Sequence, residues 1–335
     1  MDFKTQVSGT GGLAGVSADA LLVLVTGDKL PADLDRALAA VLAPALEDGD
    51  FSCKAGQTLY AHRVTGVRAA RVLFVHAGDG SVKAWRKAVG AGVGLLKGGA
   101  TRQLAVAVVG GVELGAAHAE ALVCAAEDAV YLYRQTKPSA PAAPRLRGLA
   151  LVCGKAQQSE IQAGLRRGQA VAAGVTLARE LANRPGNHAT PTVLAEQAKR
   201  LGKDFGLKVE VLDRKDAEKL GMGSFLAVAQ GSQEPPKFIV ARWNGGAKGD
   251  APVVLVGKGI TFDTGGISIK PAAEMDEMKF DMGGAASVLG TLRAVAELKA
   301  KVNLIGIIPC CENMPDGRAI KPGDVVTSMS GQTIE

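Results

Sequence analysis

Short apolar runs alternate with longer helix-like segments along the first half of the chain, and this alternation constrains the fold more than any other feature. The apolar runs have the length and composition of buried strands and lie at Leu21 to Val25, Val72 to Val75, Leu104 to Val109 and Leu149 to Val152. The helix-like segments between them are Asp33 to Leu46, Ser81 to Lys97 and Ala116 to Arg134. This order predicts an α/β domain over residues 1–155, with a mostly parallel sheet and helices on both faces.

A long helical pattern without proline follows, and it predicts a helix over residues 156–184 that links two domains. Thr190 and Pro191 are then typical of the start of a further helix. The remaining chain predicts helices at 193–205, 214–221 and 285–298, and strands at 208–212, 238–243, 253–256 and 304–309. We therefore expect a second α/β domain over residues 185–335, without internal repeats.

The composition is ordinary for a globular protein and narrows the classes of function. Of 335 residues, 47% are hydrophobic and 21% charged, while aromatic residues make up 4%, too few for a stacking platform for single-stranded nucleic acid. The net charge of +6 is scattered and forms no basic stripe. The five cysteines, an odd number without a CxxC pair, indicate free thiols in a reducing compartment. With no signal pattern and no apolar run of membrane length, we expect a cytoplasmic protein that does not associate with membranes.

Four charged residues gather beyond the end of one predicted strand. Val253 to Val256 is typical of a buried strand that ends at Gly257. The loop after it carries two lysines and two carboxylates, Lys258, Asp263, Lys270 and Asp281. Open α/β sheets place their chemistry at the carboxyl ends of strands, so this loop is the candidate functional site.

The residue types in this loop suit divalent cations. Carboxylate oxygens bind magnesium, manganese or zinc, and a carboxylate that bridges two ions can begin a two-metal site. We expect Lys258 to be buried next to the strand end, where it can lose its proton and offer a neutral amine as a ligand. Lys270 can instead stay charged and stabilise an oxyanion. A glycine-rich loop with solvated charges is the alternative, but Asp281 stands among Phe, Met and Gly and not on a polar face.

The same stretch resembles the leucyl aminopeptidase family, the hexameric two-metal cytosolic aminopeptidases. The residues that carry the resemblance are VGKGITFDTGGISIKP followed by MKFDMGGAA, which match without a gap. RELANRPGNHATP also resembles the start of the family's catalytic domain. The resemblance implies a macro-domain-like N-terminal α/β domain and a C-terminal α/β catalytic domain with a central mixed sheet.

By this resemblance, Lys258, Asp263 and Asp281 are metal ligands for two divalent ions, manganese or zinc, and Asp263 bridges both. Lys270 is the catalytic lysine, which binds the substrate by holding its gem-diolate intermediate. Met278 resembles the methionine that lines the pocket for the first side chain of the substrate, and an ordinary core methionine is the equal alternative. The resemblance further implies a homohexamer that removes N-terminal residues, preferably leucine or another bulky apolar residue, from peptides.

The family also carries a second motif, Asn-Thr-Asp-Ala-Glu-Gly-Arg, shortly after a hairpin that resembles Pro322 to Glu335. Its acidic residues complete the metal site, and its arginine holds a bicarbonate thought to act as general base. The sequence stops at Glu335, with three of the five implied metal ligands. We therefore expect it to be a fragment of a longer chain.

Two other functions stay open. Some bacterial members of the family also act as DNA-binding architectural or regulatory proteins, and the net positive charge permits this role. A two-metal phosphoesterase would use the same aspartate pair, although the lysine ligand and the absence of histidine disfavour it. The isolated histidines His62, His76 and His118 receive no role, and Glu312 is interpreted as a turn carboxylate.

Overall fold

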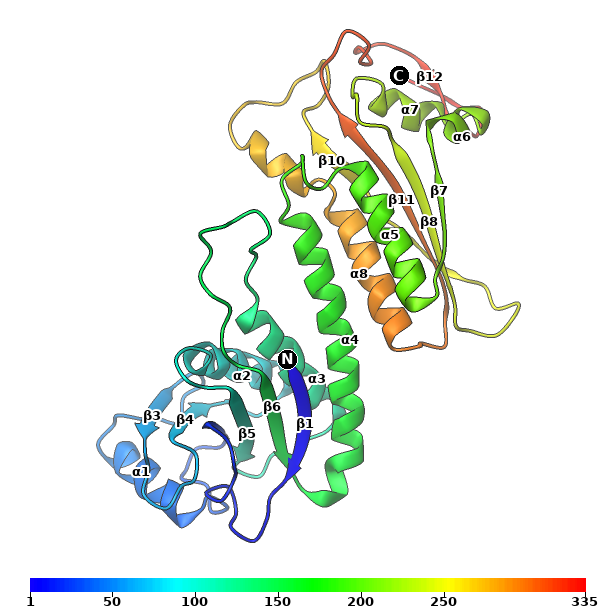
Figure 1. The fold of residues 1–335 in the computed structure, drawn as a ribbon. Helices are drawn as coiled ribbons and strands as arrows, with labels where there is room; N and C mark the ends of the chain where they lie inside the picture. The colour runs from blue at the N-terminus through cyan, green and yellow to red at the C-terminus, as the bar shows by residue number, and fades with distance from the viewer. The chain divides into compact units, whose positions relative to one another are not determined.

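The computed structural model describes residues 1–335, which form two compact units (Figure 1). The N-terminal unit comprises Met1–Leu132 and Ser139–Ala172, and the C-terminal unit comprises Tyr133–Pro138 and Ala173–Glu335. The division falls within α4 (Gln158–Ala182), the long helix that the sequence predicts. Each unit has a sheet of its own.

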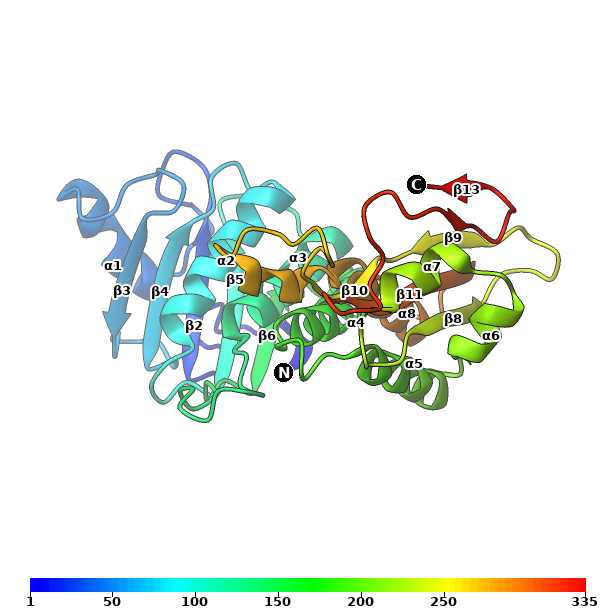
Figure 2. The ribbon, with the colours of Figure 1, turned by 90° about the horizontal axis from the view of Figure 1, so that it is seen from above.

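The sheet of the N-terminal unit has six strands in the order β1-β6-β5-β2-β4-β3. Figure 2 shows the neighbours β2, β4 and β3 at one end of this order. All neighbours are parallel except β3 and β4. The strands are β1 (Asp2–Val7), β2 (Ala20–Val25), β3 (Thr58–His62), β4 (Arg71–His76), β5 (Gln103–Val109) and β6 (Gly148–Cys153). The mostly parallel sheet is thus confirmed. The sequence analysis misses β1 and β3, because these edge strands mix polar and apolar residues and form no apolar run.

Helices cover both faces of this sheet, as predicted. They are α1 (Arg36–Glu47), α2 (Val82–Leu96), α3 (Ala116–Val130) and the first part of α4. The short 3₁₀ helix η1 (Lys155–Gln157) comes directly before α4. Side chains alternate along β2, so that Leu22 and Leu24 join a hydrophobic core with α2 and α3. Leu21 and Val23 point the other way, into a second core with α1. Every residue of β2 is therefore buried.

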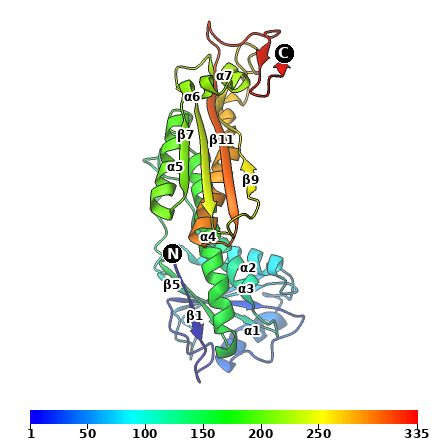
Figure 3. The ribbon, with the colours of Figure 1, turned by 90° about the vertical axis from the view of Figure 1, so that its right-hand side faces the viewer.

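The sheet of the C-terminal unit has five strands and is mixed, as predicted. The order is β10-β11-β8-β7, and β9 pairs with the first part of β11. The strands are β7 (Lys208–Leu212), β8 (Lys237–Asn244), β9 (Val253–Val256), β10 (Gly259–Asp263) and β11 (Asn303–Asn313). β11 runs parallel to β9 and β10 but antiparallel to β8. Figure 3 shows β7, β8 and β11 side by side, with β9 beside β11. A separate hairpin, β12 (Val326–Thr327) and β13 (Thr333–Ile334), lies within the expected hairpin region.

Two helices, α5 (Pro191–Phe205) and α8 (Gly283–Glu297), pack with the end of α4 against this sheet in one hydrophobic core. As predicted, Thr190 caps α5 by accepting a hydrogen bond from Val193 N, and proline follows in the first turn. The shorter elements are α6 (Arg214–Lys219), α7 (Gly223–Ala229) and the 3₁₀ helix η2 (Met275–Phe280). None of the helices of the chain combines the length and the apolar composition that a membrane-spanning helix needs.

Two expectations about the start of the candidate site are wrong. β9 is not buried, since it lies at the sheet edge with β11 as its strand neighbour and its Val256 is 70% exposed. Nor does Gly257 open a loop that holds Asp263. After a break at Gly257 and Lys258, β10 continues along the same neighbour, and Asp263 is the last residue of that strand.

Candidate metal centre

Lys258 stands at the break in the edge strand, where two glycines allow a close approach. A Cβ atom on Gly257 would lie 2.5 Å from Gly284 O, and one on Gly284 would lie 2.7 Å from Lys258 N. Ala285 N, in the first turn of α8, donates to Lys258 O at 2.9 Å. The start of α8 therefore touches the break. Asp281 lies two residues before that helix and is brought next to Lys258 in this way.

Asp263 ends β10, and the following loop turns back toward it. Gly265 adopts a left-handed conformation, with φ of 86°, which glycine adopts without strain. Lys270 N then donates to Thr264 O at 2.9 Å and closes the loop. The loop returns the side chain of Lys270 to the strand end, where its Nζ lies 2.9 Å from Asp263 Oδ2.

The structure brings all four charged residues of the sequence analysis together. Lys258 Nζ lies 2.8 Å from Asp281 Oδ2 and 3.8 Å from Asp263 Oδ2. The side chain of Asp263 is only 11% exposed, whereas that of Lys258 is 55% exposed. The expected burial of Lys258 is thus wrong, because the residue lies at an open sheet edge and reaches the carboxylates from the solvent side.

Hydrogen bonds control the charge of Asp263. Burial alone would raise the pKa of this carboxyl, but hydrogen bonds led by the one from Lys270 outweigh it and lower the pKa to about 2. Gly265 N donates to Oδ1 at 2.9 Å, and Asn313 Nδ2 donates to the same oxygen at 2.7 Å. Asp263 is therefore ionised at neutral pH. Its Oδ1 is held by protein donors, and its Oδ2 faces the lysines.

The atoms at this point fit a divalent cation. Asp281 Oδ2 is buried, and no donor reaches it in hydrogen-bond geometry, although Lys258 Nζ lies at ion-pair distance. The lysine therefore leaves the lone pairs of this oxygen without a hydrogen bond. The two Oδ2 atoms and the Lys258 amine would form a set of hard and borderline donors that suits manganese, magnesium or zinc. Nowhere in residues 1–335 do three or more His, Cys, Asp or Glu side chains form a group that could hold a metal.

The neighbours of Lys270 and the end of β11 complete the surroundings. Met278, in η2, is half-buried, and its Sδ lies 3.1 Å from Lys270 Nζ. Its role toward a substrate stays a prediction. Glu312 lies on β11 and not in a turn, and its Oε2 accepts a hydrogen bond from Ser232 Oγ at 2.6 Å.

Asn313 is the residue of this site that the sequence analysis misses. It lies 50 positions after Asp263, and an amide carries none of the charge that singled out the other four residues. The one available signal is its place shortly after the predicted strand at 304–309. Spatial proximity to Asp263 follows only from the parallel pairing of β10 with β11.

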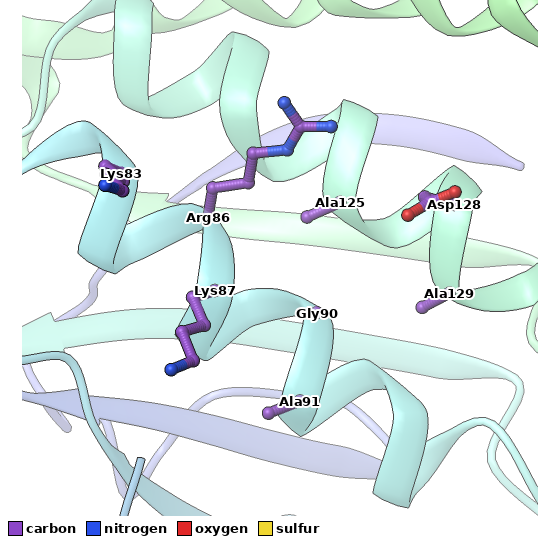
Figure 4. Close-up of a pocket in the computed structure, with 8 residues that line it drawn as sticks. All are labelled: Lys83, Arg86, Lys87, Gly90, Ala91, Ala125, Asp128 and Ala129. Atoms are coloured by element: carbon purple, nitrogen blue, oxygen red, sulfur yellow. The ribbon is translucent and has the colours of Figure 1, made fainter. Parts of the chain in front are cut away.

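The N-terminal unit has a hollow of a different character. It measures about 400 Å³ and lies between α2 and α3, over a floor of small residues (Figure 4). Its charged lining consists of Lys83, Arg86 and Lys87 from α2 and Asp128 from α3. A hollow in which basic side chains outnumber acidic ones suits an anion and not a metal ion.

Two of the three histidines without an expected role contact backbone. His76 Nε2 lies 2.9 Å from Gly27 O, and His118 Nε2 lies 3.1 Å from Gly80 O.

Both units of the chain match domains of known proteins. Residues 176–335 match the catalytic domain of the cytosol aminopeptidase family, and residues 21–139 match its N-terminal domain. Among solved structures, a mutant of tomato leucine aminopeptidase superimposes with a TM-score of 0.85 at 30% identity, over 100% of this chain and 67% of that one. The bottromycin maturation enzyme BotP in complex with Mn superimposes with a TM-score of 0.78 at 30% identity, over 95% of this chain and 64% of that one.

Curated relatives are similar along the whole chain. A probable cytosol aminopeptidase of Methylibium petroleiphilum is 63% identical over 335 residues, and one of Polaromonas naphthalenivorans is 54% identical over 336 residues. The chain spans 69% of the length of the first relative and 65% of the second. With both domains matched in order, this chain belongs to the cytosol aminopeptidase family.

Proposed function

We propose that the protein is a metallo-aminopeptidase that hydrolyses the N-terminal residue from peptides. The observation that carries this proposal is the convergence of two carboxylates and a lysine amine within 3.8 Å at the end of β10. The names of the relatives and the manganese in the BotP structure support it. Lys258, Asp263 and Asp281 would hold a pair of manganese or zinc ions.

A bound ion supplies a Lewis acid that polarises a carbonyl and makes a water molecule acidic near neutral pH. The residues of the chain then have separate tasks. Asp263 and Asp281 would hold the positive charge, and the amine of Lys258 would complete the ligands that this chain supplies. Lys270 would donate a hydrogen bond to the carbonyl oxygen as negative charge develops there.

The finer features of the proposal concern specificity and assembly. We place Met278 at the pocket for the first side chain of the substrate, which favours leucine or another bulky apolar residue. Its thioether next to Lys270 Nζ supports this position, since a flexible apolar side chain beside the reacting group can adapt to such substrates. A cytosolic homohexamer and a bicarbonate as general base complete the proposal.

Leucine p-nitroanilide hydrolysis tests the proposed activity. We expect activity that depends on manganese or zinc and is lost with EDTA. Asp281→Ala should lower it at least about 10³-fold, because the buried charge that holds the ion is gone. Asp324→Ala is the matched control, since the Asp324 carboxylate contacts Lys321, whose backbone N donates to it at 2.9 Å and whose Nζ lies 2.8 Å away, and contacts none of the four charged residues of the site.

Full activity of the Asp281→Ala variant would refute the assignment. Hydrolysis of p-nitrophenyl phosphate in place of the anilide would point to the phosphoesterase. A crystal grown with manganese or zinc should hold an ion beside Lys258, Asp263 and Asp281.

A second function, DNA binding, is favoured by the basic hollow of the N-terminal unit. Lys83, Arg86 and Lys87 lie on one face of α2 and can neutralise phosphates. We expect a gel shift with duplex DNA that weakens by orders of magnitude between about 50 and 200 mM salt. Replacing the three residues by glutamine should abolish the shift, whereas the control Lys215→Gln/Lys219→Gln should keep it.

A further inference from the structure

We infer that Asn313 is a positioning residue that fixes the Asp263 carboxylate in the orientation that presents Oδ2 to a metal ion. The inference rests on the proposed metal site. It assigns to an uncharged residue on another strand the task of setting the direction of a ligand. In metal sites, the groups that orient the ligands contribute to affinity nearly as directly as the ligands do.

The contacts of Asn313 hold Asp263 and its successor at once. Its Nδ2 donates to Asp263 Oδ1 at 2.7 Å. The backbone carbonyl oxygen of Asn313 accepts two hydrogen bonds from Thr264, one from its backbone N at 2.9 Å and one from its Oγ1 at 2.8 Å. Thr264 is buried, and its Oγ1 also accepts a hydrogen bond from Gly266 N at 3.2 Å. One asparagine thus anchors both the side chain and the backbone at the end of β10.

Asn313 supplies one of the two donors that hold Oδ1. Gly265 N is the other, so without Asn313 this oxygen would keep a single hydrogen bond, and the carboxylate could turn more freely about the bond to its Cβ. Lys270 Nζ, 2.9 Å from Oδ2, contacts the other oxygen and does not replace the donor from the neighbouring strand. Both donors bind Oδ1, so Oδ2 is left to face the two lysines.

An amide is the suitable side chain for this task. Asn313 donates a hydrogen bond without adding charge, so the net charge at the metal centre is unchanged. A carboxylate at 313 would repel Asp263, and a lysine would compete with the ion for Oδ2. The pairing of the two strands supports the assignment, since Asp263 and Asn313 are partners in the parallel ladder and lie side by side.

Binding of Mn²⁺ measured by calorimetry tests the inference. We expect Asn313→Ala to weaken Mn²⁺ binding about 10- to 100-fold and to lower kcat more than it changes KM. Asn313→Leu, which fills a similar volume without a donor, should behave alike if the alanine variant folds poorly. The matched control is Asn303→Ala, at the other end of β11, where Oδ1 accepts from Gly246 N at 3.1 Å and Nδ2 donates to Ala247 O at 3.0 Å. This control should lower the Tm and leave Mn²⁺ affinity unchanged.

A metal-free crystal structure of the Asn313→Ala variant separates this inference from the proposed function. We expect the Asp263 carboxylate to leave the orientation that it has in the wild type. If it keeps that orientation, or if the variant binds Mn²⁺ as tightly as the wild type, Asn313 does not position it. If the wild type binds no Mn²⁺, the proposed function fails, and the orientation of Asp263 in the variant still decides the role of Asn313.

Discussion

The sheet of the N-terminal unit is covered by helices on both faces, whereas the sheet of the C-terminal unit packs against its helices mainly on one. All six residues of β2 are buried. Along β11, by contrast, buried residues such as Leu304 and Ile308 alternate with half-buried ones such as Ile305 and Ile307. The edge of the second sheet is open as well, since Val256 on β9 is 70% exposed.

This difference explains where the charged cluster lies. A strand buried on both faces has no room for charge, because removing an ion from water costs several kcal/mol unless it is paired. A broken edge strand can carry a lysine that remains in contact with water while its amine reaches a buried carboxylate. The charged residues of the proposed metal site accordingly lie at the interrupted sheet.

Among the changes that compare the two units, replacing Lys270 should have the largest effect. If the C-terminal site performs the chemistry, Lys270→Ala removes the donor that stabilises the oxyanion and lowers kcat by about 10²- to 10³-fold. Steady-state kinetics with leucine p-nitroanilide measures this. The control Lys301→Ala replaces an exposed lysine of the same unit and should keep its activity. If the Lys270→Ala variant keeps the wild-type kcat, the C-terminal site does not perform the chemistry in the way proposed.

The two sheets should respond differently to truncation. Leu22→Ala opens a cavity in a fully buried strand and should cost about 3 kcal/mol of unfolding free energy. Val256→Ala, in the chain of residues 1–335, should change it by less than about 0.5 kcal/mol, because that side chain is exposed. Urea unfolding followed by circular dichroism measures both. Equal losses would show that β9 is packed as tightly as β2.

Acid should weaken the C-terminal unit through Asp263. Its folded pKa of about 2 lies below the unfolded value of 3.8, so its contribution to stability is present above about pH 4 and is lost as the pH falls through about 2. The full contribution is on the order of 2 kcal/mol. In EDTA, the Asp263→Asn variant should lack this part of the pH dependence.

Asp19 in the N-terminal unit also has a lowered pKa, through hydrogen bonds from Gln103 N and Arg102 N. Asp19 is more exposed than Asp263, so Asp19→Asn should change the pH dependence of stability less than Asp263→Asn does. A larger effect of Asp19→Asn would contradict the difference expected between the two units.

Helix starts should not distinguish the two units. Ser81 caps α2 and Thr190 caps α5, each by accepting one backbone N–H at 3.4 Å. Each substitution by alanine should therefore cost about 1 kcal/mol. Thermal melts of the two variants measure this. A large difference between them would mean that the units differ in their helices as well as in their sheets.

Much of this architecture follows from the sequence because buried strands leave a strong apolar signal. Leu21 to Val25 and Leu104 to Val109 belong to strands that begin one residue earlier. β1 leaves no such signal, since an edge strand needs no continuous apolar run. The prediction for β9 is wrong in the opposite sense, because its run of valines is typical of a buried strand although β9 lies at the sheet edge.

The candidate site is predictable to the extent that its residues lie close together in the sequence. Lys258, Asp263, Lys270 and Asp281 belong to one segment, and their chemistry singles them out. That Lys258 is exposed and that Asn313 holds Asp263 depend on how distant strands pair, which no local pattern contains.

The pairing of β10 with β11 shifts by one residue between Ile260 and Asp263. Ile260 stands beside Cys311, and Asp263, three positions later, stands beside Asn313, only two positions later. Since side chains alternate between the faces of a strand, the additional residue decides on which side of the sheet Asp263 projects. Deleting one residue at 261 or 262 would therefore turn the carboxylate to the opposite side while leaving every functional side chain in the sequence. Natural variation at this centre should accordingly tolerate conservative exchanges in β10 far better than any change in its length.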